Sequence, residues 1–194
     1  MDDPARLAAA RVFIVDPIDG TTAFLKRKPW WVVSIAVVQA GRPVAAVVHA
    51  PALDETYAAT AGGGATLNGA AIGPSSRTEL QGAAMLGDPA LFTDGRWVEP
   101  WPPMTVTRRN ALAYRMALVA AGAFDAAVAL GSKHEWDLAA GALIAAEAGA
   151  IASDRFGTPL AFNTPAARVR SLICATPGLH PLILARAAAI DVLD

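Results

Sequence analysis

The sequence predicts a mixed α/β fold in which helices pack on sheets that contain several antiparallel strand pairs. Composition is the first observation: 54% of the 194 residues are hydrophobic and 17% are charged, which is typical of a globular chain with one core or two small lobes. In the first half, short apolar runs are separated by tight turns, and this spacing favours antiparallel neighbours. In the second half, apolar residues recur at helical spacing between further apolar runs.

Short β-branched and apolar runs predict five strands in the first half of the chain. They lie at residues 11–16, 31–38, 44–50, 56–60 and 83–86. The glycine-rich segment "AGGGATLNG" (61–69) is typical of a hairpin connection, and it lacks the lysine of a P-loop. Residues 73–103, rich in Pro, Gly and Trp, show no other readable pattern.

The second half predicts four strands and three helices. The strands are 104–108, 124–130, 151–154 and 168–176, and the helices are 110–121, 136–148 and 178–190. Gly122 and Gly149 follow the first two helices, where a glycine commonly ends a helix. We expect one domain over residues 1–194, with an antiparallel sheet lobe (1–103) and an α/β lobe (104–194).

Charge and cysteine content exclude several classes of protein. The net charge of −1 gives no electrostatic footprint for nucleic acid, so "KRKPWW" (26–31) is read as an exposed loop followed by core tryptophans rather than a stacking surface. No uninterrupted apolar run is long enough to span a membrane, and the acidic start "MDDPARLAAAR" is unlike a signal peptide. One cysteine, Cys174, excludes an intramolecular disulfide framework. The expected setting is the cytoplasm, without nucleic-acid or membrane partners.

The stretch "VFIVDPIDGTTAFLKRK" (12–28) carries the strongest chemical signal. An apolar strand ends at Asp16, and Pro17 then favours an extended backbone before a turn at Asp19 and Gly20. Such a turn can aim two carboxylates and the Ile18 carbonyl at one point, and hard oxygen donors of this kind suit Mg²⁺. The hydroxyls and amides of the following threonines suit a phosphate. Asp-Pro and Asp-Gly pairs are also ordinary turn chemistry, so this motif alone leaves both readings open.

A second acidic motif, "EWDLAAG" (135–141), favours the metal reading. Asp137 is expected in the first turn of an apolar helix, where a carboxylate also simply stabilises the helix dipole. Together, the two motifs bring three carboxylates from distant parts of the chain. Metal with phosphate indicates phosphoryl-transfer chemistry.

The two motifs, "VDPIDGTTAF" (15–24) and "WDLAAGALIAAEAGA" (136–150), resemble the signatures of the inositol monophosphatase superfamily of Mg²⁺-dependent, lithium-sensitive phosphatases. The segment between them and the "TLNG" turn are also similar to the family, so the resemblance covers essentially the whole chain. It implies a layered α-β-α-β-α sandwich, two or three Mg²⁺ ions and a homodimer.

The resemblance also implies roles for individual residues. Metal would be held by Asp16, the Ile18 carbonyl, Asp19 and Asp137, and the expected catalytic residues are Thr21, which would help orient and activate the attacking water, and Asp19. The backbone amides of Gly20 and Thr22 would cradle the phosphate of a small phosphate monoester, and Lys133 is a further expected substrate contact.

The chain departs from the family before its first motif. Family members carry N-terminal helices, a hairpin and a Glu-rich motif there, and one of those glutamates binds metal. Here only Asp2 and Asp3 precede the strand as acidic residues, and the segment reads as truncated. We therefore expect weak or absent turnover from the 194 residues alone, unless Asp2 or Asp3 replaces the glutamate.

The resemblance leaves the substrate open. Ala129 stands where inositol-type members carry a glutamate that binds a sugar hydroxyl, while "GSKHEWD" and "GTPLAFN" look more like the bisphosphate nucleotidase branch. Lys133 could meet a second phosphate as a point charge. The favoured prediction is a 3′(2′),5′-bisphosphate nucleotidase, converting 3′-phosphoadenosine 5′-phosphate to AMP. Alternatives are inositol-1-monophosphatase, histidinol-phosphatase, and a non-catalytic chain that binds metal or phosphate.

Overall fold

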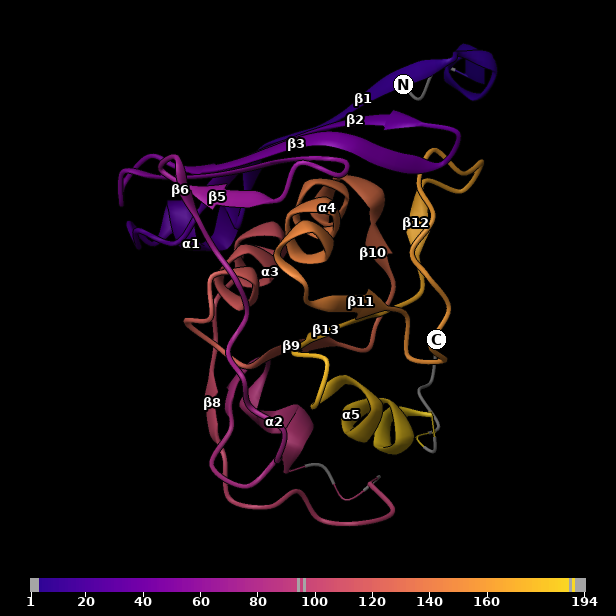
Figure 1. The fold of residues 1–194 in the computed structure, drawn as a ribbon. Helices are drawn as coiled ribbons and strands as arrows, with labels where there is room; N and C mark the ends of the chain where they lie inside the picture. Colours follow the sequence, from indigo (N-terminus) through magenta and orange to yellow (C-terminus); the bar gives the residue numbers. More distant parts are fainter. Residues whose placement is uncertain (1–3, 94, 96, 189, 191–194) are drawn as a thin grey trace.

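The computed structural model describes residues 4–93, 95, 97–188 and 190, and its elements stack as sheet, helices, sheet and helix (Figure 1). The first layer is a six-stranded antiparallel sheet in the order β1-β2-β3-β4-β5-β6. Its strands are β1 (Arg11–Asp19), β2 (Val32–Gln39), β3 (Arg42–Ala50), β4 (Glu55–Thr60), β5 (Ala65–Leu67) and β6 (Ala70–Ala71). From β2 onward, sequential neighbours pair across short turns, as the sequence predicts, whereas β1 and β2 pair across the longer connection 20–31.

The glycine-rich connection between β4 and β5 is the predicted hairpin, and a distant carboxylate fastens it. Glu147 accepts hydrogen bonds from the amides of Gly62 and Gly64, both at 2.9 Å. These glycines have φ of +75° and +76°, which side chains with a Cβ adopt only at a cost. The hairpin is therefore tied to the helix that carries Glu147.

The second sheet is mixed and has the order β11-β13-β9-β7-β8. β7 pairs in parallel with both β8 and β9, whereas β13 pairs antiparallel with β9 and β11. A separate two-stranded ladder joins β10 to β12. The bounds are β7 (Ala84–Leu86), β8 (Thr105–Thr107), β9 (Ala126–Ala129), β10 (Lys133–His134), β11 (Ile151–Ser153), β12 (Arg168–Val169) and β13 (Leu172–Ala175).

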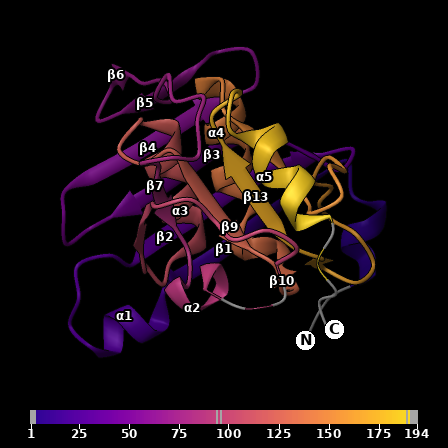
Figure 2. The same ribbon diagram turned by 90° about the horizontal axis from the view of Figure 1, so that it is seen from below.

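Two helices lie between the sheets and others lie outside the second sheet. α3 (Leu112–Ala120) and α4 (Ala139–Ala148) are buried almost all round, because both pack between apolar layers. α5 (His180–Ala187) packs against β13 on the far side, and Figure 2 shows it running beside this strand. The short helix α2 (Pro89–Phe92) follows β7 of the same sheet. The remaining short helices are α1 (Thr21–Leu25) and the 3₁₀ turns η1 (Pro4–Ala8) and η2 (Glu135–Asp137).

Several predicted bounds are corrected by the structure. The predicted helix 136–148 begins as α4 at Ala139, so Asp137 lies in the preceding 3₁₀ turn η2 rather than in the first α-helical turn. The predicted strand 168–176 is two strands, β12 and β13, in different sheets. They separate beside Ser171, whose buried hydroxyl accepts a hydrogen bond from the Arg155 amide at 2.8 Å. The predicted helix 178–190 forms over His180–Ala187, and Ala189 lies outside the described residues.

Short elements escaped prediction because local pattern is weak over a few residues. These are α1, which follows Gly20 directly, α2 within the unreadable region 73–103, and β10. The mixed α and β class is confirmed, and so is antiparallel pairing for the first four predicted strands, β1 to β4. The fifth, β7, is an exception, because it pairs in parallel with β8 and β9. The division into lobes at residue 103 stays a prediction, although β7, which precedes that residue, belongs to the second sheet.

The two faces of the six-stranded sheet have different surroundings. Its inner face is buried against α3 and α4, as at Val32, Ala36 and Val48. Its outer face carries apolar side chains too, and among the described residues no helix covers it (Figure 1). Phe13 there is 74% exposed. The described layers, sheet, helices, sheet and helix, agree with the expected sandwich. None of the described helices combines the length and apolarity needed to cross a membrane.

Candidate functional site

Three carboxylates from the two predicted motifs meet at one point. One oxygen each from Asp16, Asp19 and Asp137 lies within 4.8 Å of the other two. The register of β1 against β2 shifts between Asp16 and Asp19, and this bulge turns both side chains of one strand end toward η2. The sequence prediction that these distant residues converge is met by the geometry.

Asp19 is the most enclosed of the three carboxylates, at 5% exposure. Its Oδ1 accepts the Leu112 amide at 3.1 Å, and its Oδ2 accepts the Ala113 amide at 2.8 Å. These amides open α3, so the helix N-terminus favours a negative charge here. Burial nevertheless raises the pKa of Asp19 well above its usual range, and the neighbouring charges of Asp16 and Asp137 add to this rise against the opposing hydrogen bonds.

Asp16 is held by a local turn. Its Oδ1 accepts the Ile18 amide at 2.9 Å, which fixes the carboxylate across Pro17. Partial burial raises the pKa of Asp16, and the charge of Asp137 adds to the rise. The Ile18 carbonyl, expected as a metal ligand, accepts the Thr21 hydroxyl at 3.1 Å and keeps a second lone pair.

Asp137 enters the site from η2. Its Oδ2 accepts the His134 amide at 3.1 Å, and the preceding carbonyl, that of Trp136, accepts a longer bond from Ser34 on β2 at 3.4 Å. Burial raises the pKa of Asp137, while His134, Lys133 and Arg168 oppose the rise. Three carboxylates that resist ionisation when close together are a donor set that a divalent cation fits, because its charge offsets their repulsion.

Gly20 and α1 form the other wall of the cluster. Gly20 has φ +88° and lies against the start of α3, where an added Cβ would come within 3.0 Å of the Ala111 Cβ. The carbonyl of Gly20 accepts the amides of Ala23 and Phe24 at 2.7 and 3.0 Å, which opens α1. The first amides of a helix have no intrahelical acceptor, so those of Thr21 and Thr22 can serve an anion when one binds. Both threonines are exposed.

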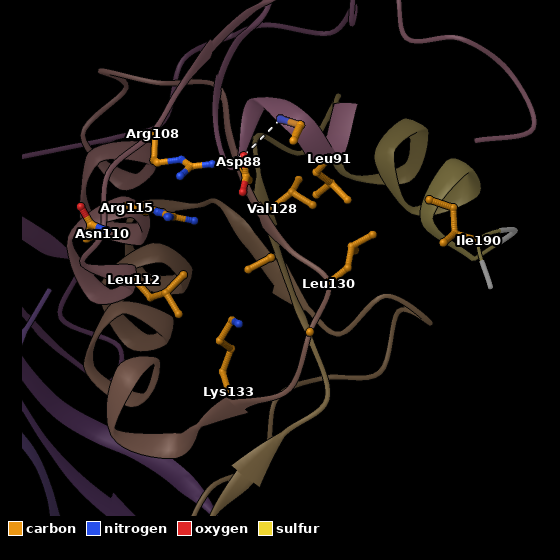
Figure 3. A pocket seen from close by; sticks show the side chains of 13 residues that line it. Asp88, Leu91, Arg108, Asn110, Leu112, Arg115, Val128, Leu130, Lys133 and Ile190 are labelled. Atoms are coloured by element: carbon orange, nitrogen blue, oxygen red, sulfur yellow. Dashed lines mark hydrogen bonds and ion pairs between the residues drawn. The ribbon is translucent and has the colours of Figure 1, made fainter. Parts of the chain in front are cut away.

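A cavity of about 590 Å³ adjoins the carboxylate cluster through Leu112, whose amide binds Asp19 (Figure 3). Lys133 and Arg115 point their charged ends into it. Arg108 also lines the cavity and forms an ion pair with Asp88, the N-cap of α2. The cavity is therefore lined by three cations and one paired carboxylate, and the predicted substrate contact Lys133 is among them.

The cavity distinguishes among three arginines near the start of α3. Of the three arginines near the start of α3, Arg108 and Arg115 line the cavity, whereas Arg109 stacks on Trp30 with its guanidinium carbon 4.2 Å from the ring centre. Asp88 was missed because it lies in the unreadable region. His134, which follows Lys133, stacks on Trp136 with the ring centres 4.0 Å apart and is not among the residues that line the cavity. Asp2 and Asp3, the suggested substitutes for a missing glutamate, lie outside the described residues.

Comparison with known proteins places this geometry in a family. Residues 2–191 match the model of the "Inositol monophosphatase family". The chain is 37% identical over 158 residues to Nus factor SuhB of Pseudomonas aeruginosa, covering 76% of this chain and 58% of that protein. It is 33% identical over 180 residues to an inositol monophosphatase of Dictyostelium discoideum, covering 86% of this chain and 63% of the relative. The chain thus spans less than two thirds of these curated relatives.

The solved structures agree with the sequence comparison. An inositol monophosphatase of Thermotoga maritima superposes with a TM-score of 0.79 at 31% identity, covering 93% of this chain and 69% of the other. The fold expected from the motifs is therefore confirmed.

Proposed function

This chain belongs to the inositol monophosphatase family. We propose that it functions as a metal-dependent phosphatase that acts on a small phosphate monoester. The observation that carries the proposal is the cluster of Asp16, Asp19 and Asp137, whose oxygens converge within 4.8 Å beside a cavity lined by cations. The hard oxygen donors and their raised pKa values fit Mg²⁺, and two or three ions are proposed.

Each side chain of the site has a proposed task. Asp16, Asp19, Asp137 and the Ile18 carbonyl would hold Mg²⁺, which when bound lowers the pKa of water and offsets charge on the departing oxygen. Thr21 donates to the Ile18 carbonyl, so its own oxygen is left to accept a hydrogen bond and orient the attacking water. The Gly20 and Thr22 amides would hold the phosphate at the start of α1.

The finer proposal is a substrate with a second anionic group, of which 3′-phosphoadenosine 5′-phosphate is the favoured example. Lys133, Arg108 and Arg115 line one cavity, and although Arg108 is paired with Asp88, Lys133 and Arg115 leave the lining with a net positive charge that favours a second anionic group. Burial lowers the pKa of Lys133, while the charge of Asp137 opposes this, so the lysine lies close enough to the cluster to sense it. Ala129 lines the same cavity and provides space without a polar group for a sugar hydroxyl.

Inositol-1-phosphate is the second candidate substrate. The name of the relative from Dictyostelium discoideum favours it, and the 590 Å³ cavity has room for the ring. A cytoplasmic setting and a homodimer are further proposals, supported by the lone buried Cys174 and by the family resemblance respectively.

The test measures phosphate release from both substrates and from histidinol phosphate, with and without Mg²⁺, beside Mg²⁺ binding by calorimetry. We expect weak Mg²⁺-dependent release that falls at least 100-fold in Asp19→Asn. Lys133→Gln should raise KM about 10-fold for the bisphosphate and little for inositol-1-phosphate. Mg²⁺ binding without release would support the non-catalytic alternative. Absence of both binding and release would refute the proposal.

A further inference from the structure

Glu135 is a buried carboxylate that the proposed reaction does not use. It lies in η2, two residues before Asp137, and only 2% of it is exposed. A buried carboxylate is costly unless its lone pairs are satisfied. Its partners therefore indicate what it does.

Within the described part of the chain, the hydrogen bonds to the Glu135 carboxylate come from one loop. Its Oε2 accepts the Asn163 amide at 2.6 Å, and its Oε1 accepts the Thr164 amide at 2.9 Å and the Thr164 hydroxyl at 2.6 Å. The Glu135 amide in turn donates to the Ala167 carbonyl at 3.1 Å. Four hydrogen bonds thus fasten the first residue of η2 to residues 163–167.

The loop is itself held on its other side. Arg6 donates to the Asn163 side-chain oxygen at 2.8 Å and to the Thr164 carbonyl at 2.9 Å, while the Asn163 side chain donates back to the Arg6 carbonyl at 3.0 Å. The Phe162 amide donates to the Gly41 carbonyl at 3.0 Å, which ties the loop to the turn between β2 and β3. The loop is therefore a fixed support for η2.

Asp137 needs such a support because its neighbours repel it. Its carboxylate is brought within 4.8 Å of two others, and its own hydrogen bond is to the amide of His134 at the end of β10, at 3.1 Å. A longer bond of 3.4 Å joins the Trp136 carbonyl to Ser34 on β2. The bonds of the Glu135 carboxylate attach the turn to a further segment, residues 163–164, and are shorter than either of these.

We propose that Glu135 is a positioning residue that fixes η2, so that Asp137 is preorganised for a divalent cation together with Asp16 and Asp19. This inference rests on the proposed metal-dependent function. Groups that orient metal ligands without touching the metal typically change affinity 10- to 100-fold when removed. The bonded loop extends the effective site to residues that lie outside both sequence motifs.

The test compares Glu135→Gln with Glu147→Gln. Both residues are carboxylates that accept two backbone amides, and both substitutions remove one charge, but Glu147 fastens the hairpin and not η2. Mg²⁺ affinity of the 194-residue chain is measured by calorimetry and stability by urea unfolding. We expect Glu135→Gln to weaken Mg²⁺ binding at least 10-fold and Glu147→Gln to change it less than 2-fold. Glu135→Gln should lose more stability because Glu135 is buried, so the affinities are compared where urea unfolding shows both variants to be folded.

Thr164→Val provides a second measurement should Glu135→Gln fail to fold. It removes one of the three bonds to the carboxylate and leaves both amides, and we expect a 2- to 5-fold weaker Mg²⁺ affinity. Equal affinity in wild type, Glu135→Gln and Thr164→Val would overturn the inference and leave the proposed function standing. Failure of the wild type itself to bind Mg²⁺ would overturn both.

Discussion

Gly20 shows at the level of one residue how the backbone shapes the site. Its φ of +88° lets the chain turn from β1 into α1, and its missing side chain lets the start of α3 approach. Asp19, the preceding residue, binds the first amides of that helix. The glycine thus permits the contact on which the position of Asp19 depends.

We predict that Gly20→Ala destabilises the chain by about 2 to 4 kcal/mol, from the left-handed backbone and from the clash with Ala111. Gly64→Ala is the matched control, because Gly64 has φ +76° but nothing within 4 Å of an added Cβ. Urea unfolding should give the control a loss of only about 1 to 2 kcal/mol. Equal losses in the two variants would show that the approach of α3 to Gly20 is unimportant.

The identity of the carboxylates could be predicted from sequence, and their hydrogen bonds could not. "DPIDG" and "EWD" mark Asp16, Asp19 and Asp137 because acidic residues at the end of an apolar strand and at a helix start are chemically conspicuous. The partners of Asp19 are backbone amides of Leu112 and Ala113, and every residue but proline offers the same amide. Only the packed fold selects which amides these are.

At the scale of elements, α3 and α4 approach closely through Gly141. An added Cβ there would lie 2.8 Å from the Met116 Cβ and 3.2 Å from the Ala113 carbonyl. Gly141 lies inside the second sequence motif, in the first turn of the buried helix α4, and glycine is a poorer helix former than alanine. The close packing of α3 against α4 at this glycine offsets the lower helix propensity.

We predict that Gly141→Ala lowers the unfolding free energy by about 1 kcal/mol. Overpacking costs about 1–3 kcal/mol, and the better helix propensity of alanine returns up to about 1 kcal/mol. Differential scanning calorimetry should show a lower Tm. A raised Tm would mean that α3 and α4 can move apart to accommodate the added methyl group at little cost. The gain in helix propensity would then exceed the loss from overpacking.

α5 is joined to the second sheet by a buried polar pair, Ser153 and His180, whose Oγ and Nε2 atoms are 2.9 Å apart. Burial lowers the pKa of His180, so the native protein resists its protonation. Below about pH 6.5 the unfolded chain gains a proton that the native chain does not. The contribution to stability is therefore complete above this pH and is lost as the pH falls toward the lowered native pKa.

The prediction is that the unfolding free energy of wild type falls between pH 7.5 and pH 5 by more than that of His180→Gln. Urea unfolding at the two pH values measures the difference, and carboxylate titrations cancel because they are common to both proteins. An identical pH dependence would show that His180 is protonated as readily in the native state as in the unfolded chain.

Strand and helix predictions succeeded where the pattern is long, as in β2, β3 and α3, and failed where tertiary contacts set the bounds. The apolar run 168–176 is locally a single strand, yet it divides beside Ser171, whose hydroxyl binds the Arg155 amide. Asp137 was expected inside the helix, but the contacts of Glu135 with Asn163 and Thr164 hold a 3₁₀ turn there. Neither contact has a local signature.

At the scale of the whole molecule, the carboxylate cluster lies where the two sequence motifs meet across the layers. β1 belongs to the six-stranded sheet, α3 lies between the sheets, and η2 connects the ladder of β10 to α4 (Figure 1). Each contributes one part: two carboxylates, two backbone amides and the third carboxylate. The site can therefore form only when the layers are assembled, and a ligand that binds it stabilises the entire fold.

We predict that Mg²⁺ raises the Tm of wild type and leaves Asp137→Asn nearly unchanged. Without a cation, the three close carboxylates repel one another, and an asparagine removes one charge while its side-chain oxygen can still accept the His134 amide. Asp137→Asn should therefore melt at or above the wild-type Tm in chelator. At a free Mg²⁺ concentration 100 times Kd, binding should add about 2.7 kcal/mol to the unfolding free energy of the wild type.

Sodium chloride at matched ionic strength separates screening from binding, because screening acts on all exposed charges and does not require the third carboxylate. An equal rise in both proteins, or an equal rise with sodium chloride, would contradict a specific cation site assembled from the two motifs.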